Sequence, residues 1–509
     1  MPENLSRRTI FKVLAGVGAS TVVAGGLSAC GSTNTSSTSS SSAAASESTS
    51  SNSNDIGANQ TSIFDGQAHE VSMTVSDENL KTLLEAFQND TEKTWVDADA
   101  TIDGTKIEKV GIRLKGNSTV KTLSSATLEA TDSASTSATA SATASDSASA
   151  SSDSTTDSSN NAATDNKQPA GGGGGGGGGN SASSIDADKP QTWPFLIAFD
   201  KNTENQVFQG YSRMSLRPGI PVLNEAVALG MTEKTGQKTQ KYTYVKYTLN
   251  GYDQTTRLMV VVPDEYYAAE LGDGILYKSD SESSFSYQGD DSATYEDQFK
   301  QVNGDDNESP IIELLKWFDN ASDEEFAADL AKHIDVDSFA QYVATQNLLV
   351  NSDDMAGPGK NYYLWYDNKT KLFTVIAWDL DLSMSGNASA GPDDTISMGG
   401  GGGGMPAGGQ GMTGQGAGGQ GGGGGMSSGN ALKEKYLSTD SFQDSYHRAY
   451  WDLYDQIYGN NAAADYLKNL ATVVPVTKCL TQETLDSSVK TLTTWISERT
   501  SALKSQRSS

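Results

Sequence analysis

The sequence predicts an α+β fold, with a β-rich amino-terminal part and a mainly helical carboxyl-terminal part. Between residues 62 and 262, short apolar runs alternate with turn residues, a pattern typical of strands. After residue 300, apolar residues recur at helical spacing behind Ser, Asp and Glu capping residues. Outside low-complexity segments, about 350 of the 509 residues remain, which exceeds one small core and suits two lobes.

The expected strands lie in the first part, where Asp103-Gly104 predicts a tight turn between the second and third of them. We expect strands at residues 68–75, 99–102, 106–115, 192–200, 242–250 and 255–262, and helices at 80–87 and 222–232. In the second part we expect helices at residues 309–321, 322–333, 337–350, 436–457 and 482–504.

Three segments carry too little apolar surface to repay the entropy of ordering, so we expect them to be disordered. Residues 31–61 are rich in Ser, Thr, Ala and Asn and indicate a tether. Residues 124–187 and 386–429 are expected to be insertions in loops of one domain that spans residues 62–505. No Gly-Lys-[Ser/Thr] follows their glycine runs, so neither is typical of a phosphate loop.

The first thirty residues indicate an export signal and do not belong to the fold. Residues 6–12 resemble the twin-arginine export consensus, an apolar run covers residues 13–26, and residues 27–30 resemble a lipobox that ends in Cys30. We expect lipidation of Cys30, which would anchor the protein to the cell membrane on its extracytoplasmic face. A Sec signal with a coincidental arginine pair is the alternative export route.

The composition excludes several classes of function. A formal net charge of −28 argues against nucleic-acid binding, because no basic stripe meets the phosphates. Once Cys30 is lipidated only Cys479 remains, so no intramolecular disulfide is expected. The histidines at 69, 333 and 447 lie too far apart in the sequence to form a zinc motif.

Two apolar runs, residues 362–366 and 372–378, flank a turn-forming tetrad at 367–370 and predict a β-hairpin. The second run is nearly all apolar, which indicates a strand buried on both faces. It is followed by Asp379 and Asp381, and if the strand continues, alternation places both carboxylates on one face. Carboxylates at the end of a buried strand need compensation, and a cation is the usual one.

Acidic and amide residues also precede the hairpin: Asp353 and Asp354 in a turn-rich segment, and Asn361 at the start of the first strand. Protein kinases use the same order, in which one carboxylate orients the attacking hydroxyl while an amide and a later carboxylate hold Mg²⁺. Here Asn361 follows Asp353 by eight residues, against roughly five in the kinase catalytic loop. A surface hairpin with solvated acids is the alternative interpretation.

These residues resemble the CotH family, the spore-coat-protein-H-like atypical kinases. The family signatures N-x-D and W-D-x-[DN] stand at residues 351–353 and 378–381, and N-Y-Y-L-Y reads N-Y-Y-L-W, with Trp365 in the last place. VGIRLKGNST, at residues 110–119, resembles the family motif R-x-[RK]-G-N-S-[ST]. The likeness extends to residues 194–201, 213–219, 274–280 and 333–351, and so to most of the chain outside the low-complexity segments.

The resemblance implies an atypical kinase-like two-lobe fold, with Mg²⁺ and ATP as cofactors and Ser or Thr of an envelope or surface protein as the acceptor. Asp353 would orient the hydroxyl, with Asp354 as a second candidate. The residues that would hold Mg²⁺ are Asn361, Asp379 and Asp381. The residues that would bind the nucleotide phosphates are Arg113, Lys115, Gly116, Asn117 and Lys278.

The chain departs from the family pattern in its nucleotide-facing part. Many members carry basic residues where this chain has Leu196 and Ala198, and an acidic V-E-Q where residues 260–264 read Val-Val-Val-Pro-Asp. A catalytically degenerate family member that acts as a surface binding or scaffold lipoprotein is therefore the first alternative. A solute-binding lipoprotein, which the tether and anchor equally fit, is the second.

Overall fold

The computed structural model describes residues 54–89, 94–115, 186–396 and 429–508, all within the compact unit Asn52–Ser509. The expected export signal, most of the tether and most of both insertions lie outside these residues. The described part is mixed α and β, as the sequence predicts. None of its helices combines the length and the apolar character that crossing a bilayer requires.

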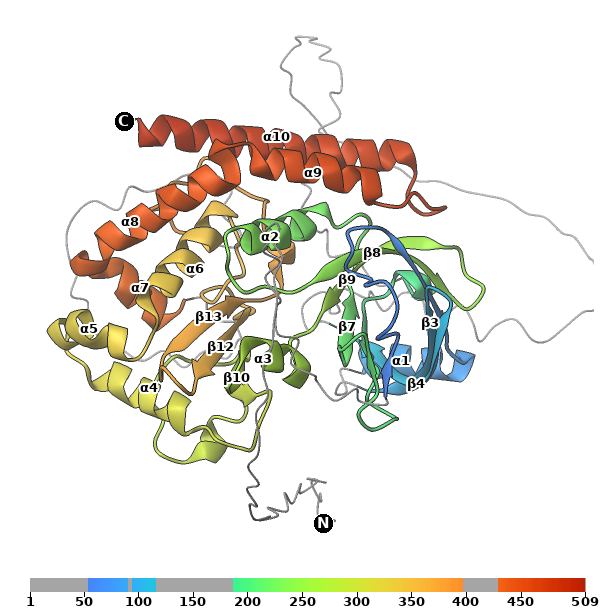
Figure 1. Ribbon diagram of the computed structural model, residues 1–509, viewed down its shortest axis with the longest axis horizontal. Coiled ribbons are helices and arrows are strands. Elements are labelled where there is room, and N and C mark those ends of the chain that lie inside the picture. Colours follow the sequence, from blue (N-terminus) through green and yellow to red (C-terminus); the bar gives the residue numbers. More distant parts are fainter. Residues whose placement is uncertain (1–53, 90–93, 116–185, 397–428, 509) are drawn as a thin grey trace, which may run out of the picture. The chain divides into compact units, whose positions relative to one another are not determined.

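A closed barrel forms the first part of the described chain, with strand order β2-β3-β4-β5-β7-β9-β8 (Figure 1). Neighbouring strands are antiparallel except β2 and β8, which pair in parallel and close the barrel. The barrel strands are β2 (His69–Thr74), β3 (Val96–Ile102), β4 (Thr105–Leu114), β5 (Phe195–Ala198), β7 (Arg213–Leu216), β8 (Tyr242–Leu249) and β9 (Thr255–Val261).

The expected strands of this part are confirmed, with shorter bounds at several ends. The turn at Asp103-Gly104 is confirmed as well, since both residues have positive φ (46° and 80°), as a type I′ turn requires. Ile112, Ile197 and Met214 are fully buried inside the barrel. Because side chains alternate along a strand, the residues between them lie on the outer face.

A second sheet has the order β11-β10-β12-β13 and is wholly antiparallel. Its strands are β10 (Gly274–Ser279), β11 (Phe299–Gln301), β12 (Tyr362–Asp367) and β13 (Phe373–Ala377); the short pair β1 (Asp55–Ile56) and β6 (Val207–Phe208) lies apart. The α-helices are α1 (Asp77–Gln88), α2 (Leu223–Lys234), α3 (Glu265–Leu271), α4 (Ser309–Asn320), α5 (Asp323–Asp329), α6 (Val336–Leu348), α7 (Ala431–Ser438), α8 (Asp440–Tyr454), α9 (Ala462–Val473) and α10 (Gln482–Arg507).

The helical predictions hold with two corrections. The helix expected at residues 436–457 is two helices, α7 and α8, because Thr439 adopts an extended conformation between them. The sequence prediction also missed α9, although Ala463, Leu467 and Leu470 follow helical spacing and are buried.

The β12–β13 hairpin is confirmed. The Asp367 carboxylate accepts the backbone N–H groups of Lys369 and Thr370 at 2.8 and 2.7 Å, which fixes the turn. Leu364 packs into the large helical core while Trp365 packs into a smaller cluster, so the hairpin is buried on both faces.

The strand does not continue through the acid pair, which corrects the alternation expected there. β13 ends at Ala377, and Asp379 adopts a left-handed conformation (φ 56°, ψ 63°) before the 3₁₀ turn Leu380–Leu382. Leu380 is fully buried in the helical core. The extended conformation therefore ends before Asp379, which lies in a left-handed conformation, whereas Asp381 lies within the 3₁₀ turn.

The first part of the segment predicted to be disordered at 386–429 is ordered, which corrects the prediction for these residues. Residues 386–396 are described and pack against α10, where the fully buried Arg499 donates to the carbonyl oxygens of Ala388 and Ala390. Arg499 also donates to the carbonyl oxygens of Asn347 and Leu348, at the end of α6, at 2.9 and 3.2 Å. One cation thus ties the segment after Asp381 to two helices.

Candidate functional site

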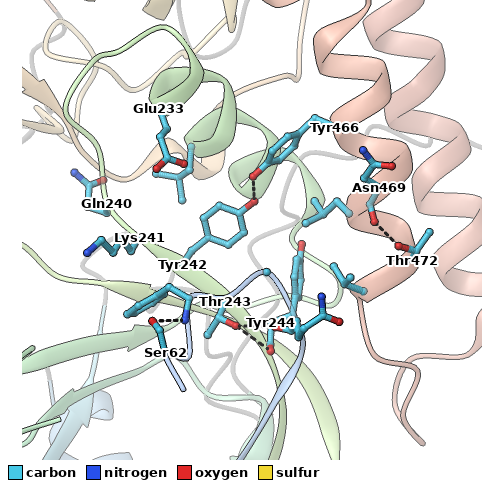
Figure 2. A pocket seen from close by; sticks show the side chains of 16 residues that line it. Ser62, Glu233, Gln240, Lys241, Tyr242, Thr243, Tyr244, Tyr466, Asn469 and Thr472 are labelled. Carbon is cyan, nitrogen blue, oxygen red and sulfur yellow. Dashed lines mark hydrogen bonds between the residues drawn. The ribbon is translucent and has the colours of Figure 1, made fainter. Parts of the chain in front are cut away.

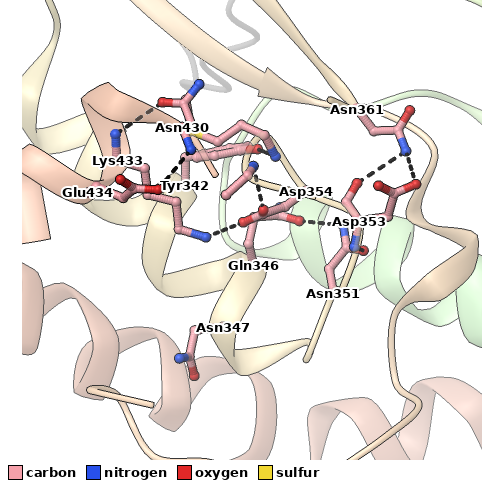
Figure 3. Close-up of polar contacts among 12 residues, drawn as sticks. Tyr342, Gln346, Asn347, Asn351, Asp353, Asp354, Asn361, Asn430, Lys433 and Glu434 are labelled. Atoms are coloured by element: carbon pink, nitrogen blue, oxygen red, sulfur yellow. Dashed lines mark hydrogen bonds and ion pairs between the residues drawn. The ribbon is translucent and has the colours of Figure 1, made fainter. Parts of the chain in front are cut away.

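Asp353 lies in a tight loop between α6 and β12 that fixes both oxygens of its carboxylate. Oδ1 accepts the backbone N–H of Gly359 at 2.6 Å, and Oδ2 accepts Nδ2 of Asn361 at 2.9 Å (Figure 3). Glycine is required at position 357 of this loop, since a Cβ on Gly357 would lie 2.4 Å from Cα of Asp353. The loop therefore presents one carboxylate in one orientation.

Asp354 has a different environment from its neighbour. Its side chain is buried, Oδ1 accepts the backbone N–H of Ala356 at 2.8 Å, and Oδ2 forms an ion pair with Lys433 at the start of α7 (Figure 3). Asp354 is buried and its charge is compensated by Lys433, whereas Asp353 is only half-buried and has no cationic partner among the described residues, which indicates that Asp354 secures the loop to α7. Of the two acids, Asp353 is the better placed to meet a substrate.

Asn361 lies opposite Trp378, the residue before Asp379, at the open end of the hairpin, because the backbone N–H of Trp378 donates to the carbonyl oxygen of Asn361 at 3.3 Å. The amide nitrogen of Asn361 donates two hydrogen bonds to Asp353, one to its carboxylate and one to its backbone carbonyl oxygen. The amide oxygen has no protein partner in the described part of the chain and remains available as a ligand.

Two cations meet the Asp379 carboxylate. Arg217 Nη1 lies 2.7 Å from Oδ1, and Lys115 Nζ lies 3.3 Å from Oδ2. Both also lie over the ring of Trp378, at 5.2 Å for Arg217 and 4.8 Å for Lys115. Arg217 forms a second, fully buried ion pair with Glu225 in the first turn of α2.

This network separates the pKa values of its acids. Burial alone would raise the pKa of Asp379, but Arg217 and Lys115 lower it to about 2. Burial, with the negative charges of Asp379 and Glu225, raises the pKa of Asp381 to about 8. Burial and the adjacent Arg217 lower the pKa of Lys115.

Asp353 and Asp379, on either side of the hairpin's first strand, interact electrostatically. Burial is the main cause that raises the pKa of Asp353, and the charge of Asp379 adds to it. Lys278, opposite Tyr363 in the β10–β12 pairing, helps to lower the pKa of Asp379. The fold thus brings Asp353, Asp379 and Lys278 into one neighbourhood from three separate elements.

A metal hypothesis can be tested on the donor atoms. No group of three or more His, Cys, Asp and Glu side chains suited to a metal occurs within residues 54–89, 94–115, 186–396 and 429–508. Mg²⁺ does not need such a group, since it commonly binds one or two carboxylates and completes its shell with phosphates and water. The amide oxygen of Asn361 and the carboxylate of Asp379 are oxygen donors of the kind that requirement names.

The outer face of the barrel adds a second group of cations. In the strand register, Arg113 of β4 lies beside Leu196 of β5, which lies beside Ser215 of β7; Arg213 lies one row further, beside Ala198. The two positions at which relatives carry basic residues therefore lie on this face.

Arg113 has no carboxylate partner among the residues that the structure describes. Its Nη1 donates to the carbonyl oxygen of Leu114, and its guanidinium lies 5.3 Å from the ring of Trp95. Burial, together with the like charge of Arg213, lowers the pKa of Arg113 to about 10. Arg213 pairs with Asp200 at 3.6 Å, and its buried Nε has no partner.

Three predicted residues, Gly116, Asn117 and Cys30, lie outside the described residues. In the sequence analysis Arg217 appears only within the family-like segment 213–219, without a role, and Glu225 was missed. A signal for Glu225 exists, because it lies inside an apolar helical run at residues 222–231, where an acid must be paired to be buried. Its neighbour Asn224 donates to the carbonyl oxygens of Asp381 and Ser383 at 2.5 and 3.0 Å, so α2 also holds the turn after Asp379.

Comparison with known proteins places these residues in context. The family model described as "CotH kinase protein" matches residues 179–503, which include Arg217, Asp353 and Asp379. Inner spore coat protein H of Bacillus subtilis (strain 168) is 25% identical over 168 residues. The match covers 31% of this chain and 46% of that protein, so the chain spans about half the length of this curated relative.

Proposed function

Because the chain belongs to the CotH kinase protein family, we propose that it is an atypical protein kinase. It transfers phosphate from Mg-ATP to Ser or Thr hydroxyls of an envelope or surface protein. The observation that carries the proposal is the setting of Asp353, held by Gly359 and Asn361 beside the Asp379 network. Lipidated Cys30 anchors the protein to the extracytoplasmic face of the cell membrane.

In this proposal the domain of residues 62–505 has two lobes, the barrel and the helical part. Kinases need an ion pair between a strand cation and a helix glutamate close to the phosphates. The buried pair of Arg217, just after β7, and Glu225 on α2 supports the analogy. The same helix holds the backbone of Asp381, because Asn224 donates to its carbonyl oxygen. This contact links the Arg217–Glu225 pair to the acids after β13.

Each polar group has a role that follows from its contacts. Asp353 accepts a hydrogen bond from the acceptor hydroxyl and orients it, while Asp354 secures the loop. Asn361 and Asp379, with Asp381, would hold Mg²⁺, which supplies charge neutralisation to the phosphates. Excluding water from the Trp378 side strengthens these interactions, because that ring is buried.

The charge balance indicates which cations are available to phosphate. Glu225 and Asp379 already compensate Arg217 and Lys115. Arg213 pairs with Asp200, and Arg113 pairs with no carboxylate among the described residues, so these two arginines are the stronger candidates for the phosphates of the nucleotide. Lys278 and the Gly116-Asn117 turn complete the proposed set.

Alanine variants of Asp379 and Asp353 test the proposal, because they should fail in different ways. Asp379→Ala removes a hard oxygen ligand, so the increase in melting temperature caused by Mg-ATP should disappear together with phosphate transfer. Asp353→Ala leaves that ligand in place, so the Mg-ATP shift should persist while turnover falls by about 10²–10⁴. Asp444→Ala, at an exposed position of α8, is the matched control.

A scaffold function is the second candidate, and Leu196 with Ala198 favours it, since neither can contact phosphate through charge. Under this alternative the wild type shows neither a Mg-ATP shift nor transfer to any hydroxyl substrate. That result would overturn the kinase proposal and leave a surface lipoprotein that uses the fold to bind a partner.

A further inference from the structure

A cavity of about 580 Å³ lies apart from the candidate site, between α2, the start of β8, α9 and the segment before β2 (Figure 2). Its volume is in the range of small-molecule sites. None of the acids or cations discussed above lines it. Its central feature is a pair of phenols, Tyr242 and Tyr466, whose hydroxyl groups are hydrogen-bonded at 2.6 Å.

The lining combines flat apolar surfaces with neutral polar groups. Phe64, Tyr242 and Tyr466 contribute partly exposed rings, and the exposed side chains of Gln67 and Asn469 have no hydrogen-bond partner in the part of the chain that the structure describes. Burial raises the pKa of both Tyr242 and Tyr466, so their hydroxyls stay neutral.

Two side chains of the lining carry a formal charge, Lys241 and Glu233. The ammonium of Lys241 turns to the Tyr211 hydroxyl and lies 3.5 Å from Glu270, so its charge is compensated outside the cavity. Glu233 is exposed at the rim and supplies an acceptor. The cavity therefore suits a neutral ligand with many hydrogen-bonding groups better than a phosphate or another strongly charged one.

We propose that this cavity binds a neutral saccharide of one or two rings. A sugar ring offers an apolar C–H face to the tyrosine rings and hydroxyl groups to the amides and phenols around them. Aliphatic ligands would leave the polar groups of the rim without partners.

The cavity shares two elements with the candidate site, and this part of the inference rests on the proposed function. Gln240 lines the cavity, and its Nε2 donates to the carbonyl oxygen of Ala377, two residues before Asp379, at 2.9 Å. Leu229 and Glu233 lie on α2, the helix that also carries Glu225. A saccharide that contacts α2 and Gln240 should therefore change the binding of Mg-ATP.

The experiment measures binding of N,N′-diacetylchitobiose to the purified protein by saturation-transfer NMR and titration, without nucleotide. We expect saturable binding, and we expect Asn469→Trp, which fills the rim, to weaken it at least about tenfold. Lys468→Trp is the matched control at an adjacent exposed position of α9 that does not line the cavity, and it should bind as the wild type does. Melting curves confirm that both variants fold.

Three results would overturn the inference: no binding up to about 10 mM probe, equal binding by the wild type and Asn469→Trp, or tighter binding of glucose 1-phosphate than of the neutral probe. Coupling is measured separately, as the change in the Mg-ATP melting shift on adding the probe. If the probe binds while Mg-ATP produces no shift, the kinase proposal fails and the saccharide site stands.

Discussion

Gly359 offers a test of the Asp353 geometry that removes no functional group. Its φ is not positive, so alanine is compatible with the backbone, but the new Cβ would lie 2.5 Å from Oδ2 of Asp353 and 2.8 Å from Nδ2 of Asn361. Ordinary contact between such atoms begins near 3.4 Å, so the carboxylate or the amide must move by about 0.9 Å. A displacement of that size at a reacting group reduces turnover by about 10²-fold.

Gly359→Ala should therefore lose most of its phosphate transfer while its unfolding free energy falls by only about 1–2 kcal/mol, the usual cost of a local overpacking. The assay is transfer of labelled phosphate from ATP to a Ser-rich substrate, beside melting curves with and without Mg-ATP. Gly251→Ala is the matched control, because no atom lies within 4 Å of its added Cβ. Turnover of Gly359→Ala within about threefold of the wild type would refute the idea that this loop positions Asp353.

Three further predictions concern other parts of the chain. In EDTA, Asp381→Asn should raise the melting temperature at pH 8 and leave it unchanged near pH 4. The pKa of Asp381 is about 8 in the folded state and 3.8 as the ordinary value, so the folded protein keeps a proton that the unfolded chain loses. The wild type therefore loses stability as the pH rises from about 4 to about 8, whereas the neutral Asn does not. Equal melting temperatures of the variant and the wild type at pH 8 would contradict this. Cys30→Ala should move the protein from the membrane fraction to the soluble one, and sedimentation with membranes would disprove lipid anchoring through this residue. Arg499→Ala should lower the unfolding free energy by at least about 3 kcal/mol, measured by denaturant titration, because several buried carbonyl oxygens lose their donor; a loss below about 1 kcal/mol would show that water replaces it.

Local features of the site were predictable from the sequence because short-range physics fixes them. The turn at residues 367–370 carries an Asp whose side chain accepts backbone N–H groups of the same turn, and Thr374 is the only polar residue in the apolar run that follows. The placement of Asn361 beside Asp353 follows in the same way from the short loop between them.

Long-range features were not predictable in this way. The Arg217–Asp379 pair joins residues that are far apart in sequence, and no periodicity indicates which cation an acid will meet. The left-handed conformation of Asp379 was also missed, since a non-glycine residue gives no composition signal for positive φ. Closure of the barrel depends on the parallel β2–β8 pairing, which only the assembled fold specifies.

The contacts of Arg499 have a consequence for the timing of biosynthesis. The segment after Asp381 is tied to α10, the last helix of the described chain, and to the end of α6. During translation, Asp353, Asn361 and Asp379 emerge long before Arg499 does, so a growing chain carries the acids while this segment still lacks its anchor. The region around the acids therefore completes its contacts only when α10 has been made. A polypeptide that ends before Arg499 would carry the acids without the hydrogen bonds that hold the segment after Asp381.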